Sequence, residues 1–441
     1  MLEKLKLYIK TMQSKNFTYK KRQIDIPLNS WKIISLIGVR RVGKSFLLYQ
    51  LIDELKQKWV KKEQILFFSF EDDRFEFVQE NLDLILQAYK ELYPEQDFQN
   101  VYVFFDEIQD VDWWEKFVRR IYDFETKNIF ITGSSAKLLS KEIATALRGR
   151  SLSYEIYPLS FSEYLSFKDI EVDLYLEQSI LKVKNEFWNY LEWSFPEIVF
   201  LDTDLRYRVY KEYLDVMIFR DLIQRYEIKN DKALYYFIKR MLSNVAKEFS
   251  VNKIFNELKS NWLKISKEYL YTWLKYLEDI YLIFVNEKFS SSIPKKEFSI
   301  KKAYAIDNWF VNLFTFSDIG RKLENLVYIE LKRRWNEIYY HKNRKECDFI
   351  VWGQKRDLRS EEGFEAGREM LKESFENKWW EKVFLSLNWD LLPIQVTYSL
   401  EDEQTKEREI AWLVEAMKMY WLKEGLILHM MKKMRFIWKM I

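Results

Sequence analysis

The first third of the chain alternates short apolar runs with a segment of helical spacing. Apolar runs at 31–37, 101–105 and 129–132 predict buried strands, because a strand covered on both faces is apolar throughout. After the first run, leucine and isoleucine recur every three or four residues over 46–59 and predict an amphipathic helix. Strands that alternate with helices predict an α/β domain, which we assign to residues 1–157.

Beyond the first domain the pattern changes twice. Residues 158–226 are mostly helical by spacing, with an interruption at Pro196 and an amphipathic stretch over 210–228, and predict a helical lid. Residues 227–300 predict two helices and a pair of strands, and residues 301–441 return to an α/β pattern. The expected elements are helices over 251–260 and 266–280 (with Ser266 as N-cap), strands within 281–289, a helix over 320–335, strands over 337–342, 346–352 and 393–400, and a helix over 410–420.

The bulk composition adds few constraints. The chain has 441 residues, of which 48% are hydrophobic and 32% charged, and its net charge is +3. This length predicts two to four domains, and the charge balance neither favours nor excludes nucleic acid. The single cysteine, Cys347, excludes an intramolecular disulfide and a cysteine zinc cluster and favours a reducing, cytoplasmic setting. Residues 1–10 lack the apolar core of a signal peptide, and no apolar run reaches the roughly 18 residues of a membrane span.

The segment GVRRVGKS matches the P-loop pattern G-x-x-x-x-G-K-[ST] and stands between a predicted strand and a predicted helix. Its backbone amides would cradle phosphate oxygens, and the helix amino end adds partial positive charge. Lys44 would reach the β- and γ-phosphates, and Ser45 would offer its hydroxyl to Mg²⁺. The alternative is a surface turn with a chance lysine, against which the flanking elements argue. The predicted ATP contacts are Gly38, Val39, Arg40, Arg41, Val42, Gly43, Lys44, Ser45 and Phe46.

Two acidic residues, Asp106 and Glu107, end the second apolar run. Open α/β sheets bind ligands at the carboxyl ends of their strands, which is where this pair stands. Asp106 would hold Mg²⁺, directly or through water, and Glu107 would polarise the attacking water. A solvated strand end explains the pair equally well by itself, but its place on a second buried strand after a P-loop favours catalysis.

A third polar group follows the run at 129–132. Thr132, Ser134 or Ser135 would lie beside the phosphates, where such a residue senses the γ-phosphate. Ser134 is equally well explained as the N-cap of a following helix.

Four arginines are candidates for charge stabilisation. Arg148 and Arg150 flank a glycine before another strand and could stabilise transition-state charge, in the same chain or from a neighbouring subunit. Arg220 and Arg225 could reach the nucleotide from the lid. Solvated basic turns and helix surfaces are the alternatives for both pairs.

The motifs together resemble a known family. GVRRVGKS, FFDEIQD, ITGSSA and an RGR followed by YPLSFSEYL are similar to the archaeal-type AAA+ ATPases, of the signalling (STAND) and origin-binding P-loop branch. The resemblance implies ATP and Mg²⁺ as ligands, hydrolysis of ATP, and a five-stranded parallel sheet with the magnesium-binding strand beside the P-loop strand. It is sharpest through about residue 165.

Relatives of that family carry a winged helix where residues 227–300 lie. Its second helix could bind DNA, but Tyr269, Tyr271, Trp273 and Tyr276 dominate that helix here. Aromatic residues at this density favour packing or a protein contact over base recognition. Both interpretations stay open.

Residues 301–441 resemble the restriction-endonuclease-like PD-(D/E)XK fold. The resemblance places Glu324 at the helix glutamate and Asp348 at the metal aspartate. Gln395 stands where the second acid belongs and Thr397 where the lysine belongs, so a metal site of Glu324, Asp348 and Gln395 is incomplete. We therefore expect a degenerate domain that binds DNA or protein rather than an active nuclease. His341 is interpreted as a strand-surface residue.

The sequence leaves three segments of the C-terminal half without a motif. Residues 353–392 read as an amphipathic helical insertion, and the tail at 429–441 could pack as a helix or dock on a partner. A basic cluster could contact phosphate groups, or be a solvated helix end; its members are Lys332, Arg333, Arg334, Lys342, Arg344 and Lys345. The prediction is an ATP-hydrolysing protein that acts on DNA through its C-terminal half. The alternative is a signalling or scaffold ATPase whose C-terminal half binds a protein partner or a second copy.

Overall fold

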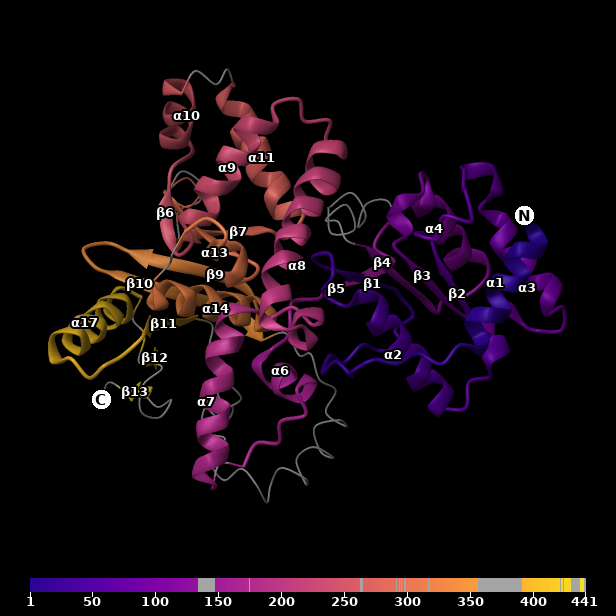
Figure 1. The fold of residues 1–441 in the computed structure, drawn as a ribbon, viewed down its shortest axis with the longest axis horizontal. Helices are drawn as coiled ribbons and strands as arrows, with labels where there is room; N and C mark the ends of the chain where they lie inside the picture. The colour runs from indigo at the N-terminus through magenta and orange to yellow at the C-terminus, as the bar shows by residue number, and fades with distance from the viewer. Residues whose placement is uncertain are drawn as a thin grey trace. The chain divides into compact units, whose positions relative to one another are not determined.

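The computed structural model forms two compact units (Figure 1). The first comprises Met1–Tyr157 with Asp279–Tyr281, and the second comprises Pro158–Glu278 with Leu282–Ile441. The described residues are 1–133, 147–173, 175–261, 265–290, 292, 294, 296, 299–315, 318–355, 391–420, 422, 424–429 and 437–439.

The first unit is an α/β domain around a parallel sheet, as predicted. Its five strands lie in the order β2-β3-β4-β1-β5, and β1 and β4 are buried along their whole length. Helices between consecutive strands allow the parallel pairing. The strands are β1 (Ile33–Ile37), β2 (Ile65–Ser69), β3 (Tyr102–Asp106), β4 (Ile129–Gly133) and β5 (Ser151–Glu155), and the helices are α1 (Leu2–Ser14), α2 (Lys44–Gln57), α3 (Asp83–Leu92) and α4 (Trp114–Phe124).

One expectation about this sheet is wrong. The resemblance implied that the strand ending in Asp106 lies beside the P-loop strand, but β4 lies between β3 and β1. Sequence patterns show which segments are strands and not which strands pair. The inserted strand brings its own Thr132 to the carboxyl edge between the two motifs.

The second unit begins with the predicted helical segment. Proline fixes φ near the helical value but donates no hydrogen bond, so Pro196 stands before a 3-10 helix rather than inside α7. The amphipathic stretch 210–228 is α8 continued by a π-helix, η7. The elements are α6 (Phe161–Phe167), α7 (Glu177–Glu192), η6 (Glu197–Phe200), α8 (Thr203–Val216) and η7 (Met217–Gln224).

A three-stranded antiparallel sheet with three helices follows. β8 pairs with both β6 and β7, so the order in this sheet is β6-β8-β7. The strand pair expected within 281–289 is a single strand, and its partner β8 lies beyond the expected boundary at residue 300. The elements are α9 (Asp231–Ser243), β6 (Lys247–Phe249), α10 (Val251–Ser260), α11 (Lys267–Asp279), β7 (Ile283–Lys288) and β8 (Lys301–Ala305).

The last part of the chain contains the helices predicted over 320–335 and 410–420 and the strands predicted over 337–342, 346–352 and 393–400. β9, β10 and β11 pair antiparallel, and β12 runs parallel to β11 after the crossover helix α17. The end of β7 pairs with β9, which joins this sheet to the preceding one. The elements are α13 (Asn308–Asn312), α14 (Ile319–Arg334), β9 (Trp335–Lys342), β10 (Glu346–Lys355), β11 (Leu391–Thr397), α17 (Glu403–Met419), β12 (Glu424–His429) and β13 (Ile437–Lys439).

Two further predictions concern the insertion and the C-terminal tail. The helical insertion expected over 353–392 is too long at both ends, because residues 353–355 belong to β10 and residues 391–392 to β11, and the rest of it lies outside the described residues. The tail is not helical where it is described, because residues 437–439 form β13 and pair antiparallel with β12.

Candidate active site

The P-loop is fixed tightly at the carboxyl end of β1. A Cβ atom at Gly38 would stand 2.3 Å from the carbonyl oxygen of Ile156, so only glycine fits there. Gly43 has a φ of 95° and directly precedes α2. Val39 and Val42 are fully buried. Close backbone packing and two buried side chains therefore hold the loop in place.

Lys44 lies at the start of α2 and is only 4% exposed. Its ammonium donates to the carbonyl oxygens of Gly38, at 3.2 Å, and Val39, at 3.1 Å, and lies 3.6 Å from Oε1 of Glu107. Neutral carbonyls are weaker acceptors than phosphate oxygens. The amine is thus held where a phosphate could replace the loop carbonyls.

Asp106 ends β3 and accepts hydrogen bonds from two hydroxyl groups. Thr132 Oγ1 donates to Oδ1 of Asp106 at 2.6 Å, and Ser45 Oγ donates to the same oxygen at 3.0 Å. Burial raises the pKa of Asp106 to about 6, although the two hydroxyls act to lower it. A carboxylate next to the P-loop hydroxyl is a donor set that fits Mg²⁺.

Glu107 follows directly and has a left-handed backbone, with φ of 49°. Its amide donates to Thr132 Oγ1 at 2.9 Å, and its Oε2 accepts from Gln109 Nε2 at 2.6 Å. A positive φ at a non-glycine residue is strained and is often found at functional sites. Thr132 therefore connects the carboxylate of Asp106 with the backbone of Glu107: its hydroxyl donates to the first and accepts from the second.

Thr132 is the one of the three polar candidates that falls within the described residues. Ser134 and Ser135 lie outside them. Because the Thr132 hydroxyl donates to Asp106, its structural part is to orient the metal carboxylate. Sensing of the γ-phosphate stays a prediction for all three.

The two arginines before β5 lie at the opposite edge of the sheet from the P-loop. Ile33, the first residue of β1, pairs with Ser151, and its amide donates to the carbonyl of Arg150 at 2.8 Å. A strand of five residues separates them from the loop, about 16 Å. Arg150 is also paired with Asp123 at 2.9 Å. The structure therefore does not bring Arg148 and Arg150 to the P-loop of the same chain, and their role in stabilising charge, in the same chain or from a neighbouring subunit, stays a prediction.

Arg22 is a site residue that the sequence did not indicate. Its buried guanidinium donates to the carbonyl of Val42, at 2.9 Å, and to that of Tyr157, at 3.0 Å. Its amide donates to Gln50 on α2 at 2.8 Å. The segment before β1 therefore braces the P-loop, through contacts distant in sequence that no local motif encodes.

Arg220 and Arg225 belong to the second unit, in the π-helix η7 and directly after it. Their contact with the nucleotide stays a prediction.

The structure also brings together the residues predicted for the C-terminal site. Lys302, on β8, lies 3.0 Å from Glu324 on α14, and 2.6 Å from Glu346 and 3.6 Å from Asp348 on β10. Tyr304 donates to Glu324 at 2.7 Å. Burial lowers the pKa of Lys302, but the surrounding acidic and phenolic groups outweigh it and raise this pKa well above its ordinary value. Burial and the charge of Glu324 raise the pKa of Asp348.

Gln395 has both ends of its amide engaged. Its Oε1 accepts from the amide of Asp348 at 3.3 Å, and its Nε2 donates to Glu409 at 2.7 Å. Thr397 donates instead to the carbonyl of Ser399, at 3.3 Å. The sequence correctly paired Asp348 with Gln395 but missed the lysine beside them, because Lys302 comes from a strand that it did not predict.

One further expectation for this region is wrong. His341 is not a surface residue: it is 1% exposed, its Nδ1 lies 2.7 Å from the Tyr420 hydroxyl, and burial lowers its pKa. Three members of the basic cluster form ion pairs within the chain, and contact of the cluster with phosphate groups stays a prediction. Arg333 pairs with Glu163 and Glu330, Arg334 pairs with Glu330, and Lys342 pairs with Glu248 and Glu346.

Comparisons with known proteins agree with the P-loop geometry. A family model described as an AAA domain matches residues 30–165, and one described as a domain of unknown function (DUF8612) matches residues 186–316. The uncharacterized protein MJ1544 of Methanocaldococcus jannaschii is 41% identical over 348 residues, which are 76% of this chain and 76% of that protein. The chain is an AAA-domain protein of the same family as this relative.

Two other likenesses extend the comparison of this AAA protein. An uncharacterized protein of Haemophilus influenzae is 33% identical over 328 residues, which are 73% of this chain and 79% of that protein. A Walker-type ATPase of Pyrococcus abyssi aligns with 68% of this chain and 99% of its own, at 17% identity and a TM-score of 0.41. At so low a TM-score, the fold assignment rests on the strand order and the P-loop of the AAA protein itself. These features, with the AAA domain match, identify it as a P-loop ATPase of the AAA+ kind.

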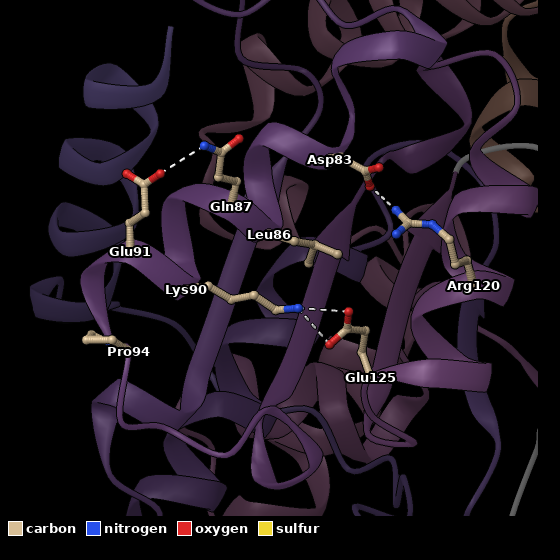
Figure 2. Close-up of a pocket in the computed structure, with 8 residues that line it drawn as sticks. All are labelled: Asp83, Leu86, Gln87, Lys90, Glu91, Pro94, Arg120 and Glu125. Atoms are coloured by element: carbon tan, nitrogen blue, oxygen red, sulfur yellow. Dashed lines mark hydrogen bonds and ion pairs between the residues drawn. The ribbon is translucent and has the colours of Figure 1, made fainter.

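A charged groove in the AAA domain lies away from this chemistry. It has a volume of about 470 Å³ and is lined by residues of α3, α4 and the segments that follow them. Figure 2 shows the lining residues. Lys90 donates to both carboxylate oxygens of Glu125, and Arg120 pairs with Asp83. None of its lining residues belongs to the P-loop, so the groove is not the nucleotide site.

Among the described residues, no helix is long and apolar enough to cross a membrane.

Proposed function

We propose that this AAA ATPase binds ATP with Mg²⁺ at Gly38–Ser45, hydrolyses it with Glu107, and acts on DNA through its C-terminal half. The observation that carries the catalytic part is the buried arrangement in which Thr132 connects Asp106 and Glu107 beside Ser45 and Lys44. Buried groups held by hydrogen bonds are preorganised, so they need not rearrange as charge develops.

Each residue has a distinct part in hydrolysis. Lys44 exchanges its loop carbonyls for oxygens of the β- and γ-phosphates, and Ser45 and Asp106 would hold a Mg²⁺ ion. A bound Mg²⁺ would supply positive charge that offsets the charge of the phosphates. Glu107 orients a water molecule and takes its proton as the water oxygen bonds to the γ-phosphorus and the bond to ADP breaks.

The DNA part of the proposal rests on residues 231–305. Their order of helix, strand, helix, helix, strand, strand, with the pairing β6-β8-β7, supports a winged helix in which α11 enters a groove of DNA. Leu270, Trp273, Leu274 and Leu277 are buried, whereas Tyr269 and Tyr271 are 60% and 50% exposed. Exposed tyrosines can stack on bases, and Lys267 and Lys275 lie on the same helix.

The fold of the remaining residues supports a domain of the restriction-endonuclease-like kind. Helix α14 is followed by three antiparallel strands, the helix α17 and a strand parallel to the third. We propose this domain for residues 301–441, with β8 shared between it and the winged helix.

A salt series with labelled duplex and branched DNA, with and without ATP–Mg²⁺, tests the DNA proposal. The variant Lys267→Gln/Lys275→Gln should weaken binding and reduce the salt slope by about 0.9 for each lost phosphate contact. The matched control is Lys232→Gln/Lys239→Gln on α9, which makes the same charge change on exposed lysines of the neighbouring helix. No binding at low salt would refute DNA as the ligand.

One observation favours a protein partner as the second candidate. Three members of the predicted basic cluster, Arg333, Arg334 and Lys342, form ion pairs within the chain, which partly offset the positive charge that the sequence suggested for this surface. In that case the exposed tyrosines of α11 would contact a protein partner. The wild type would then not bind DNA, and Tyr271→Ala would abolish binding of the protein partner.

A further inference from the structure

A buried lysine stands among the acidic residues of the C-terminal domain. Lys302 is 1% exposed, and its ammonium contacts carboxylates from two different elements, at 2.6 Å, 3.0 Å and 3.6 Å. Its carboxylate neighbours Glu346 and Glu324 have further donors, from Lys342 at 3.0 Å and from Tyr304 at 2.7 Å. A buried ammonium is stable only when paired and hydrogen-bonded in this way.

The donor atoms that a metal ion would need are already engaged. Asp348 Oδ2 accepts from the amide of Val396 at 2.9 Å, and its other oxygen faces Lys302. Gln395 directs its amide nitrogen to Glu409 and its oxygen to the backbone of Asp348. Among the described residues, no group of three or more histidine, cysteine or acidic side chains is arranged to hold a metal ion. The residues therefore do not fit the divalent cation that the nuclease-like fold implies.

The charged groups of this cluster are also buried. The side chain of Asp348 is 9% exposed and that of Lys302 is 2% exposed. The charge cluster joins β8 of the preceding sheet to α14 and β10 of the C-terminal domain.

We infer that Lys302 is the resident cation of this site: its ammonium takes the place of a divalent metal between Glu324, Glu346 and Asp348. The domain accordingly does not cleave nucleic acid, and the cluster ties β8 to α14 and β10 within the eight-stranded sheet of the second unit. This inference depends on neither ATP hydrolysis nor DNA binding, since its test contains neither nucleotide nor DNA.

Removing the ammonium should turn the cluster into a site that accepts a metal ion. Lys302→Met keeps the length of the side chain and leaves the carboxylates without their cation. Its thermal unfolding midpoint should lie below that of the wild type and rise by several degrees as Mn²⁺ is added, because binding to the folded state stabilises it. Lys301→Met is the matched control: its lysine lies next along β8 and pairs with Glu287 at 2.6 Å, so Mn²⁺ should not rescue its stability.

A second pair keeps the inference testable if Lys302→Met does not fold. The wild type and Asp348→Asn should show the same response of the unfolding midpoint to Mn²⁺. If Mn²⁺ stabilises the wild type and Asp348→Asn abolishes that effect, the native site binds metal and the inference is overturned. It is also overturned if Lys302→Met folds but its response to Mn²⁺ equals that of Lys301→Met.

Discussion

In the described part of the chain, Lys44 and Lys302 are both buried beside acidic side chains, and the two differ in their partners. Lys44 contacts two backbone carbonyls and one carboxylate, all at 3.1–3.6 Å, whereas Lys302 contacts three carboxylates, the nearest at 2.6 Å. A phosphate readily displaces neutral carbonyls but not a set of opposite charges. The first lysine is thus available to a ligand, and the second is already neutralised by its own chain.

The acidic groups beside these lysines show the same contrast. At the ATPase site, Asp106 is held by two neutral hydroxyls, which can also bind a hydrated metal ion. At the C-terminal site, Asp348 is held by a backbone amide and an ammonium. A similar inventory of residue types therefore gives a catalytic site in one unit and a structural cluster in the other.

The largest effect should come from Glu107. In Glu107→Gln, ATP hydrolysis should fall by about 10²–10⁴-fold, because the amide cannot take a proton from water. Nucleotide affinity should be unchanged. Steady-state phosphate release measures the hydrolysis rate, and nucleotide titration measures the affinity. Glu115→Gln on α4 is the control for both measurements. An unchanged rate would mean that Glu107 is misassigned.

The next effect concerns Lys44. In Lys44→Ala, ATP affinity should fall by roughly 100-fold, as expected for the loss of a charged hydrogen-bond donor in a buried site. Lys56→Ala at the far end of α2 serves as the control in the same fluorescence titration. Tight ATP binding by Lys44→Ala would contradict the P-loop assignment.

Thr132→Val tests the connection between the carboxylate of Asp106 and the backbone of Glu107. Loss of both hydrogen bonds should reduce hydrolysis by about 10-fold and lower the free energy of unfolding by about 1–3 kcal/mol. Thr126→Val is a matched control, since Thr126 is equally buried and donates to the carbonyl of Val101 at 2.8 Å. It should lose similar stability and keep its rate. Equal loss of rate in both variants would make the role of Thr132 purely structural.

The smallest expected effect is a dependence on pH. Burial raises the pKa of Asp106 to about 6, so below that pH the metal-free carboxyl is protonated and protons compete with Mg²⁺. The Mg²⁺-dependent part of ATP affinity should therefore fall by up to about tenfold per pH unit below 6 and level off above it. In Asp106→Asn, the phosphate groups of ATP still titrate, but the part of the pH dependence that comes from the Asp106 carboxyl should be absent. The same pH profile in both proteins would rule out Asp106 as its origin.

The nucleotide site was largely predictable because its chemistry is local. Phosphate binding requires a glycine loop between a strand and a helix, and the metal carboxylate must end a strand, so adjacent residues carry both signals. The order of the strands was not predictable, because pairing depends on contacts between distant segments. For the same reason Arg22 was missed, and Thr132 was one of three equal candidates until β4 was seen to lie between the two motifs.

The C-terminal half shows the limit more clearly. Periodicity located α14, α17 and the strands β9, β10 and β11, and Asp348 and Gln395 do lie together. Lys302, however, looks like half of a solvated lysine pair in the sequence and becomes buried only when β8 joins the sheet. The ion pairs of the basic cluster were not predictable for the same reason, because pairs such as Arg333–Glu163 join distant parts of the chain.

Metal stoichiometry tests the contrast between the two sites most directly. The protein would be incubated with Mn²⁺ and a hydrolysis-resistant ATP analogue, and a desalting column would then remove the unbound Mn²⁺. The Mn²⁺ that stays bound to the protein would be measured by atomic absorption. The wild type and Asp348→Asn should each retain one Mn²⁺ per chain, and Lys44→Ala should retain none. A second Mn²⁺ in the wild type that disappears in Asp348→Asn would contradict the account.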